Sequence, residues 1–284
     1  MTNHCLVCKK SSFNVIYHNT LKKCIHCGFV TANLEIDDAI LKKIYSDNYF
    51  KGEEYLNYLN DKEAITNNFN RRLNYIQKLY PSRQMGNVLE IGCAYGFFGE
   101  ELQRHYPGAS YSGFDVAEEA CAHASEVLKL NVQCADFLSA DINSSFSDIF
   151  MWDVIEHLSN PDKFIEKISQ HINKGGKLYI TTGDIGALLP KLQRAKWRMI
   201  HPPSHLHYFT KKSLIQLLEN YGFKVTKITY PGTSRSIKQI FYSLFLLKKK
   251  GNSLTRFIYN KIPKNSKITI NTFDIMFIIA KKTY

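Results

Sequence analysis

A repeated alternation of short apolar runs with helical segments, which begins at Asn87, constrains the fold of this 284-residue chain more than any other feature. Residues 88–91 form the first run, a turn bounded by glycines follows at 92–96, and an amphipathic segment continues to about His105. Strands that alternate with helices pair in parallel and are covered by helices on both faces. We therefore predict an α/β protein with a doubly wound, mostly parallel sheet. Four further strand-like runs lie at 111–115, 131–134, 147–152 and 177–182.

Acidic side chains stand at the ends of three of these predicted strands. Glu90 lies in the first, Asp115 ends the second and Asp136 follows the third. A single aspartate in such a place can equally cap a helix or anchor a loop. Because the carboxyl ends of parallel strands meet at one edge of the sheet, acids on successive strands fit one nucleoside-shaped crevice. There, Asp115 can accept both ribose hydroxyls, and Asp136 the adenine amino group, with Phe137 packed on the ring.

The turn after the first strand reads GCAYG at residues 92–96. Its small residues let the backbone approach a ligand closely. A dinucleotide site would carry G-x-G-x-x-G, but counting from Gly92 places Ala94 and Phe97 at the second and third glycine positions. The turn therefore argues against a nicotinamide cofactor.

The segments LEIGCAYG, GFDVAEEA, CADF, SDIFMWDVIEHLSNP and NKGGKLYIT resemble, in order and spacing, the motifs of class I S-adenosylmethionine-dependent methyltransferases. From about Asn87 onward the chain is most similar to the branch of ubiquinone-type O-methyltransferases and sugar methyltransferases. That resemblance implies a Rossmann-like sheet of seven strands with the last one antiparallel, and strands six and seven at 223–230 and 268–281. The family's acid-x-G-x-G-x-G pattern has Ala94 in place of its middle glycine.

The same resemblance implies S-adenosyl-L-methionine as the cofactor. Glu90, Gly92 and Gly96 would hold its methionine part. The full set of residues expected at the cofactor is Glu90, Gly92, Cys93, Gly96, Asp115, Asp136, Phe137 and Asp153.

Two C-x-x-C pairs near the N-terminus, separated by fifteen residues, indicate a metal site. Four thiolates can converge on one Zn²⁺ ion and leave no open position for a substrate, so we expect a structural zinc in a small zinc-ribbon module. Iron in a rubredoxin-like site is the alternative, and histidine ligands fit the spacing less well. The cysteines followed by this domain, together with HPPSHLHYF at 201–209, further resemble bacterial deoxysugar C-methyltransferases with an N-terminal zinc-binding domain. The expected ligands are Cys5, Cys8, Cys24 and Cys27.

Histidines are the candidate catalytic bases. An acceptor hydroxyl or an acidic carbon must lose a proton as it attacks a methyl group, and imidazole suits that role near neutral pH. His157 follows the fourth strand, while His205 and His207 lie in the loop before the next helix. We predict that these three act at the site, although His157 can also orient a helix and the other two can simply pack.

A divalent cation is an alternative use of the same turn. Asp153, Glu156 and His157 are spaced i, i+3 and i+4, on one face of a helical turn, and could bind such an ion as some ubiquinone-type relatives do. Side chains of these types recur at this spacing without a metal, so the cation is not part of the predicted site.

Three regions are expected along the chain: a zinc-binding module at 1–33, a helical connector or substrate cap at 34–81, and the methyltransferase domain at 82–284 with a basic insert at 232–266. The connector has apolar residues at helical spacing up to Pro81 and is rich in tyrosine, at positions including Tyr45, Tyr49 and Tyr55. These aromatic rings suit packing better than the mouth of a substrate site, which is the other interpretation.

Positive charge is concentrated in the last third of the chain. Residues 190–284 hold 19 Lys and Arg against Glu219 and Asp274, whereas the whole chain has a net charge of +12. A basic surface attracts phosphates of a nucleotide sugar, an anionic membrane or RNA, although many such surfaces are only solvated. Within the insert, residues 236–262 mix aromatic and aliphatic side chains with lysines and arginine. We favour a cover over the active site, and the alternatives are a peripheral membrane contact or a grip on a diphosphate-bearing substrate.

We compare three functions with these features. The first is methylation of a small anionic molecule, most readily a nucleotide- or lipid-linked sugar. The second is RNA methylation with the zinc module and the basic third as the RNA-binding parts, but DVIEH after strand four differs from the turn with which amino-group methylases stack a base. A non-enzymatic zinc module with an inactive domain conflicts with the intact acids. No DNA partner is expected, and the lack of an apolar N-terminal segment predicts a cytoplasmic protein.

Overall fold

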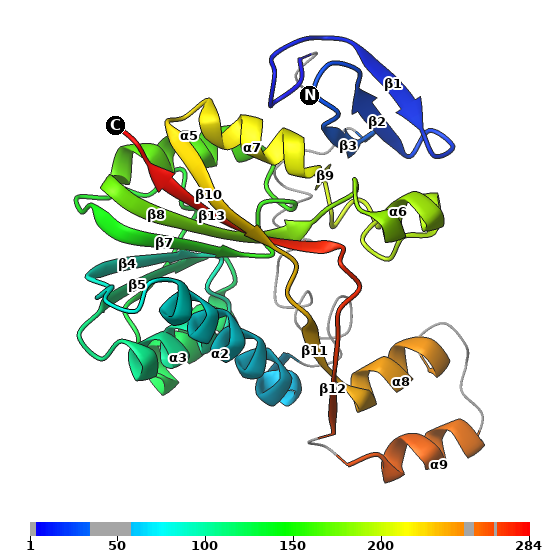
Figure 1. Cartoon of the computed structure of the whole chain (residues 1–284). Coiled ribbons are helices and arrows are strands. Elements are labelled where there is room, and N and C mark those ends of the chain that lie inside the picture. Colours follow the sequence, from blue (N-terminus) through cyan, green and yellow to red (C-terminus); the bar gives the residue numbers. More distant parts are fainter. Residues whose placement is uncertain (1–3, 35–57, 247–252, 264–265) are drawn as a thin grey trace.

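A seven-stranded sheet, in the order β10-β13-β8-β7-β4-β5-β6, forms the centre of the protein (Figure 1). The computed structural model describes residues 4–34, 58–246, 253–263 and 266–284. β13 runs antiparallel to both β8 and β10, while β4 pairs in parallel with β5 and β7. The doubly wound, mostly parallel sheet expected from the sequence is confirmed. Its strands are β4 (Asn87–Ile91), β5 (Ser110–Asp115), β6 (Val132–Cys134), β7 (Phe146–Trp152), β8 (Ile172–Gly183), β10 (Phe223–Thr229) and β13 (Ile275–Lys282).

Helices cover both faces of this sheet. Helices α5 (Pro161–His171) and α7 (Lys211–Glu219) lie on one face, and α2 (Lys62–Leu79) and α3 (Phe97–His105) lie on the other (Figure 1). Strand β13 shows why both faces need a cover: Met276 and Ile278 belong to the core on the α5–α7 face, whereas Phe277 belongs to the core on the α2–α3 face. A strand with apolar side chains on both faces is stable only when both are shielded from water.

The seventh strand is shorter than the prediction of 268–281. Residues Lys267–Ile270 form a separate strand, β12, which pairs with β11 (Thr233–Ser236) in a two-stranded ribbon. The chain turns between β12 and β13 because the buried carboxylate of Asp274 accepts hydrogen bonds from Trp197 Nε1 at 2.7 Å and Arg198 Nη2 at 3.1 Å. The insert also contains α8 (Ile237–Phe245) and α9 (Ser253–Lys261), which extend away from the sheet (Figure 1).

The predicted connector helix is described only in its second half. A short 3₁₀ turn at Tyr58–Asp61 leads into α2, which ends one residue before Tyr80. Residues 35–57, which include Tyr45, Tyr49 and Tyr55, lie outside the described part of the chain. Among the described helices, none has the length and apolarity that crossing a bilayer requires.

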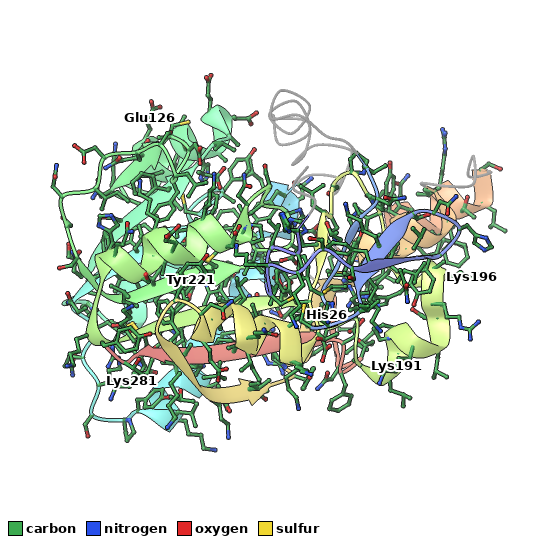
Figure 2. The ribbon with its side chains drawn as sticks, turned by 90° about the horizontal axis from the view of Figure 1, so that it is seen from above. His26, Glu126, Lys191, Lys196, Tyr221 and Lys281 are labelled. Atoms are coloured by element: carbon green, nitrogen blue, oxygen red, sulfur yellow. The ribbon has the colours of Figure 1, made fainter. Side chains whose placement is uncertain are left out.

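The N-terminal module shares a sheet with the main domain. Strands β1 (Phe13–Ile16), β2 (Leu21–Cys24) and β3 (Val30–Ala32) continue into β9 (His207–Tyr208), which pairs antiparallel with β3. Seen from above, these strands lie across the main domain, with Lys191 and Lys196 beyond them at its margin (Figure 2). Remaining short elements are α4 (Glu118–Ala122), a π-helical turn (His123–Val127), α6 (Leu188–Gln193) and a 3₁₀ turn (Arg194–Lys196).

Side-chain contacts attach this module firmly. Lys9 Nζ pairs with Asp162 of α5 at 2.6 Å, and the Asn220 side chain donates to the Val7 carbonyl at 2.8 Å. Phe29 is only 1% exposed, and its ring lies 5.2 Å from that of Phe209 in the main core. The module therefore adds to the apolar core on the α5–α7 face rather than folding beside it.

Truncation of Phe29 tests this attachment. We expect Phe29→Ala to lower the free energy of unfolding by about 3–5 kcal/mol, because it leaves a cavity between the module and the main core. The matched control is Val15→Ala on the outer strand, where the side chain is 54% exposed and the loss should be below about 0.5 kcal/mol. Urea denaturation followed by fluorescence measures both, and equal losses would show that the module does not share the core.

Candidate active site

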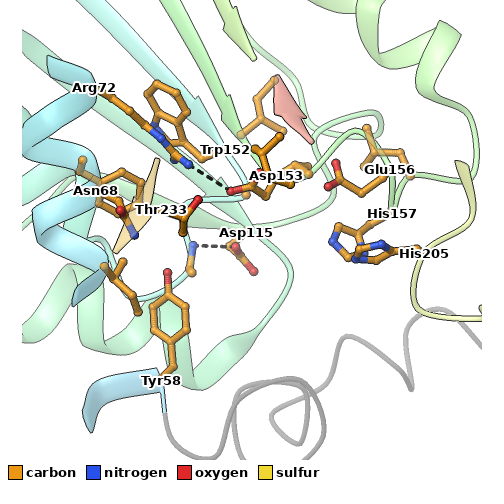
Figure 3. A pocket seen from close by; sticks show the side chains of 18 of the residues that line it. Tyr58, Asn68, Arg72, Asp115, Trp152, Asp153, Glu156, His157, His205 and Thr233 are labelled. Carbon is orange, nitrogen blue, oxygen red and sulfur yellow. Dashed lines mark hydrogen bonds and ion pairs between the residues drawn. The ribbon is translucent and has the colours of Figure 1, made fainter. Parts of the chain in front are cut away.

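A cavity of about 520 Å³ opens at the carboxyl ends of β4, β5 and β7, between the sheet, the start of α2 and strand β11 (Figure 3). Its walls come from segments far apart in the sequence. Among the predicted site residues, the lining includes Gly92, Asp115, Asp136, Phe137, Asp153, His157 and His205.

The turn after β4 holds its backbone in the left-handed region. Gly92 and Gly96 have φ values of +76° and +78°, and Ala94, at the family's middle glycine position, has φ +45°. A side chain on Gly92 would collide with Val154, so only glycine fits beside the cavity there. Cys93 and Gly96 stand behind the turn: Cys93 is buried against Gly113, and Gly96 packs against Ala124. These two residues shape the turn and do not line the cavity.

Asp115 is held by three backbone N–H groups. Its Oδ2 accepts from Ala94 at 2.7 Å, and its Oδ1 accepts from Val116 at 2.8 Å and Ala117 at 3.0 Å. Burial raises the pKa of this carboxyl, while the backbone hydrogen bonds partly oppose that rise. The carboxylate faces the cavity (Figure 3) and can accept hydrogen bonds from a ribose diol through its remaining lone pairs.

Glu90 lies behind the cavity wall. Its side chain is 2% exposed, and its Oε2 accepts a 2.5 Å hydrogen bond from Tyr111 on the neighbouring strand β5. Burial raises its pKa well above the usual range, with a further contribution from the charge of Asp115. Glu90 is not among the residues that line the cavity, so any action on a cofactor would pass through the turn that follows it.

Asp136 and Phe137 form the far end of the cavity. Asp136 is exposed, and its Oδ1 accepts from the backbone of Leu138 at 3.1 Å, which fixes the turn after β6. Phe137 is buried, with its ring 5.7 Å from that of Phe114 and 5.6 Å from that of Phe164. An apolar slot beside an exposed carboxylate suits a planar base with an exocyclic amino group.

Arg72 is a candidate site residue that the sequence pattern did not reveal. It projects from α2 into the cavity, is 7% exposed, and its guanidinium lies 4.9 Å from the Trp152 ring (Figure 3). Its ion pair with Asp153 is long, at 3.5 Å. Asp153 itself has a left-handed backbone, with φ +55°, which turns its carboxylate toward Arg72. A buried guanidinium beside the cofactor turn can pair with the carboxylate of a bound amino acid.

The structure brings two of the three predicted histidines to the cavity. His157 Nδ1 donates to the Ser204 carbonyl and His205 Nδ1 to the Met199 carbonyl, each at 2.9 Å, and their ring centroids lie 4.5 Å apart. Because Nδ1 carries the proton in both, Nε2 bears the lone pair of each neutral ring. Burial lowers the pKa of His157 to about 4 and lowers that of His205 further, with a contribution from His157.

His207 corrects the prediction of a catalytic trio. It belongs to β9, and its ring faces the N-terminal module, 5.3 Å from the ring of Phe29, with Nδ1 bonded to Thr31 Oγ1 at 3.0 Å. The pairing of β3 with β9 sets this orientation, since Thr31 is the register partner of His207. His207 therefore supports the loop and does not line the cavity.

Glu156 joins the two histidines and forms a group that could hold a cation. Its Oε2 accepts from Thr182 Oγ1 at 2.9 Å, whereas its buried Oε1 has no hydrogen-bond partner among the described residues. Burial and the charge of Asp153 raise its pKa to about 8. The ligand atoms of Glu156, His157 and His205 lie within 4.8 Å of one another, so His205 takes the place that the sequence spacing suggested for Asp153.

The outer part of the cavity is lined by α2, from the segment predicted as a connector or substrate cap, and by β11, from the predicted basic insert. Asn68 and Ser234 join these elements by two hydrogen bonds, from Asn68 Nδ2 to the Ser234 carbonyl at 3.0 Å and from the Ser234 N–H to Asn68 Oδ1 at 2.7 Å. Tyr58, Thr233 and Arg235 also line this part. Hydroxyl, amide and guanidinium groups therefore surround the space that remains beside the predicted cofactor residues.

The four cysteines converge within the N-terminal module. The Sγ atoms of Cys5 and Cys27 lie 3.5 Å apart, as do those of Cys8 and Cys24, and all four lie within 4.8 Å of one another. Each C-x-x-C segment forms a similar turn: Lys9 N donates to the Cys5 carbonyl in the first, and Gly28 N donates to the Cys24 carbonyl in the second. A tetrahedral zinc with bonds of about 2.3 Å would separate its sulfurs by about 3.8 Å, so the spacing fits such an ion.

The strand order and the crevice at the carboxyl ends of the strands fit an S-adenosylmethionine-dependent methyltransferase, and the comparison with known families establishes that class. Residues 62–228 match the family model described as a methyltransferase domain, and the chain belongs to that family. It is 31% identical over 173 residues to a ubiquinone biosynthesis O-methyltransferase of Coxiella burnetii, covering 53% of this chain and 72% of that protein. It is 30% identical over 156 residues to an uncharacterized methyltransferase of Bacillus cytotoxicus, and the match covers 51% of this chain and 73% of that protein.

Solved structures agree on the fold. Magnesium protoporphyrin IX methyltransferase of Synechocystis, determined with bound S-adenosyl-L-homocysteine, superposes with a TM-score of 0.53 at 13% identity and covers 87% of this chain and 100% of its own. The [4+2]-cyclase SpnF superposes with a TM-score of 0.52 at 15% identity, and the match covers 75% of this chain and 81% of SpnF. Since one of these proteins is named as a cyclase, the fold alone does not define the reaction, and the family match carries that conclusion.

Substitution of Asp115 tests the cofactor crevice. We expect Asp115→Ala to weaken binding of S-adenosyl-L-homocysteine by about 100-fold or more, because the half-buried charged group predicted to accept two hydroxyl hydrogen bonds is lost. Calorimetric titration measures the affinity, and Asp141→Ala, at an exposed aspartate outside the cavity lining, is the control. Unchanged affinity in Asp115→Ala would place the ribose elsewhere.

Proposed function

We propose that this protein methylates a hydroxyl-bearing or carbon-acid small molecule, most readily a nucleotide- or lipid-linked sugar, with a histidine as the general base. The observation that carries the proposal is the meeting of the cofactor crevice with His157 and His205 in one cavity of about 520 Å³. The relatives named above support a small acceptor, since the names of two of them refer to ubiquinone biosynthesis and to magnesium protoporphyrin.

The residues of the cofactor crevice have separable tasks in this proposal. Asp115 binds the ribose hydroxyls, Asp136 and Phe137 the adenine, and Arg72 the carboxylate of the methionine part. The turn at 92–96 brings backbone close to the ligand, and Glu90 supports that turn from behind. When bound, S-adenosyl-L-methionine supplies a methyl group on a positively charged sulfur, which is a good leaving group.

The chain then has to align the acceptor with the methyl group and remove one proton. His205 Nε2 takes the proton from the acceptor as its oxygen or carbon forms the new bond to the methyl group. His157 packs edge-on against the His205 ring, at an interplanar angle of 83°, and keeps it in place. Polar groups of α2 and β11 orient the acceptor, and Arg235 at the cavity wall suits a phosphate of a linked nucleotide or lipid.

His205 is the residue to substitute. We expect His205→Gln to lower kcat by about 10²–10⁴-fold while the affinity for S-adenosyl-L-homocysteine stays within about twofold, because the base acts only in the transfer step. Transfer of a labelled methyl group to a panel of nucleotide sugars and lipid-linked sugars measures the rate. His26→Gln, an exposed histidine of the N-terminal module, is the control. Normal turnover by His205→Gln would refute the assignment of the base.

Glu156, His157 and His205 could instead bind a divalent cation, and the lone pairs of the histidines would then bind the ion rather than accept a proton. Such an ion would polarise the acceptor oxygen instead of a base removing the proton. Activity that is lost on removal of divalent ions and restored by adding magnesium or manganese would favour the cation over the histidine base.

The four cysteines, we propose, hold a structural zinc ion whose task is to fix His205. The connection runs through the backbone: Ala32 N donates to the Leu206 carbonyl at 2.7 Å, and β3 pairs with β9 directly after His205. From the other side, Leu206 N and His207 N donate to the Glu156 carbonyl at 2.9 and 3.0 Å. The N-terminal module and the turn that follows strand β7 therefore hold the loop that carries His205 from two sides. This pair of contacts is called the clamp below.

Loss of one thiolate tests this clamp. We expect Cys24→Ser to reduce the zinc content, measured by atomic absorption, and to lower kcat by about tenfold or more with little change in cofactor affinity. Cys134→Ser, at an exposed cysteine outside the cluster, is the matched control. Full activity in a zinc-free Cys24→Ser protein would contradict the clamp, although it would leave the cofactor crevice unaffected.

A further inference from the structure

The helical pair α8–α9, inserted between β10 and β13, is not explained by methyl transfer. Its helices pack on each other through Tyr242 and Tyr259, whose ring centroids lie 6.0 Å apart, and through Lys238 Nζ, which lies 4.7 Å above the Tyr259 ring. No described residue of either helix lines the cavity, whereas Thr233–Ser236 of the adjoining β11 do. The ribbon thus belongs to the active site, and the helical pair projects from it (Figure 1).

This helical pair exposes an unusual amount of apolar side chain. Leu254, Phe257 and Ile258 of α9 are 63%, 60% and 41% exposed, and they share one face of the helix at i, i+3 and i+4. On α8, Ile237 and Phe245 are 39% and 42% exposed. Clusters of exposed apolar residues on one element mark a surface that is covered by something else.

Charge identifies the kind of partner. Between Glu219 and Asp274 the sequence has no acidic residue, but it has 11 Lys and Arg, of which six lie at 238–261. On α9, Arg256 is exposed on the side opposite the apolar face, and Lys261 lies beside that face, with its Nζ 5.7 Å from the Phe257 ring. Lysine and arginine together with exposed leucine and phenylalanine on an amphipathic helix match the interface of an anionic bilayer, where the apolar groups enter the acyl boundary and the cations meet headgroups.

Two other partners fit less well. A second copy of this chain would bring two surfaces of the same positive sign together, which opposes association. RNA would satisfy the lysines and could stack on Phe257, but Leu254 and Ile258 have no ring on which a base can stack.

We propose that the α8–α9 helical pair is a membrane-docking element that binds the surface of anionic bilayers. Because β11 connects this element directly to the cavity wall, docking holds the cavity near the membrane surface. This selects a lipid-linked acceptor over a nucleotide-linked one, a step that rests on the proposed function, whereas the docking itself does not.

Vesicle flotation of the full chain tests the docking without any acceptor. We expect binding to phosphatidylcholine vesicles containing about one quarter phosphatidylglycerol, at least about tenfold tighter than to phosphatidylcholine alone, and weakened by salt. The double variant Leu254→Ser, Phe257→Ser should lose about tenfold or more, and so should Arg256→Glu, Lys261→Glu. The matched control is Leu188→Ser, Leu192→Ser on α6, where the side chains are 73% and 72% exposed, and it should bind as the unaltered chain does.

Equal binding to both vesicles, no binding, or binding that the α9 variants leave unchanged would overturn the proposal. So would an RNA oligonucleotide that binds tightly through the same lysines while the leucine and phenylalanine substitutions have no effect. The substituted residues are exposed, and circular dichroism shows whether each variant keeps its fold. Methyl transfer to a water-soluble acceptor by a variant that no longer floats would separate the loss of docking from a failure of the proposed reaction.

Discussion

The parallel register of β4 with its two neighbours is the constraint on which the site depends. Ile91 pairs with Phe114 on β5 and with Met151 on β7, so the three strands end at the same level. Gly92 directly after β4, Asp115 at the end of β5 and Trp152 at the end of β7 therefore lie at the same edge of the sheet and line one cavity. A slip of one residue in either pairing would turn the apolar side chains of a strand to the opposite face, and burial on both faces prevents it. The cofactor residues are thus held by the core rather than by one another.

A second constraint holds the loop at 197–206, which has little regular structure of its own. The buried Asp274 accepts from Trp197 and Arg198 at the start of the loop, and β3 pairs with β9 at its end. Between these anchors lies His205, and the carbonyl of Met199 orients its ring. The position of the candidate base therefore depends on a strand near the N-terminus and on a carboxylate near the C-terminus. In the proposed reaction the N-terminal module thereby supports the active site, although none of its described residues lines the cavity.

Sequence reasoning located what is local in the chain. Asp115 and Asp136 lie at or just after the ends of strands that are recognisable from the residues next to them in the sequence. The order of those strands was therefore enough to predict that both acids lie at the same edge of the sheet. The place of Arg72 could not be predicted from the sequence. Helical periodicity predicts helix α2, but it does not show which residue of the helix faces a cavity formed with β7 and β11. His207 and His205 are two residues apart, and only the pairing with Thr31, 176 positions away, separates a supporting residue from a cavity residue. The break in the last strand likewise depends on Trp197, 77 positions from Asp274.

Burial also sets which of the neighbouring groups is unprotonated near neutral pH, while it lowers the pKa of both histidines and so weakens them as bases. Burial raises the pKa of Glu156 to about 8 and lowers that of His157 to about 4, so near neutral pH the glutamate tends to hold its proton and the imidazole is neutral. A neutral imidazole can accept a proton at Nε2, whereas a carboxyl that already holds its proton acts as a donor. In the proposed reaction His205 acquires one positive charge as the sulfur loses one. The net charge of the enclosed cavity is then conserved, and no new charge has to be created away from water.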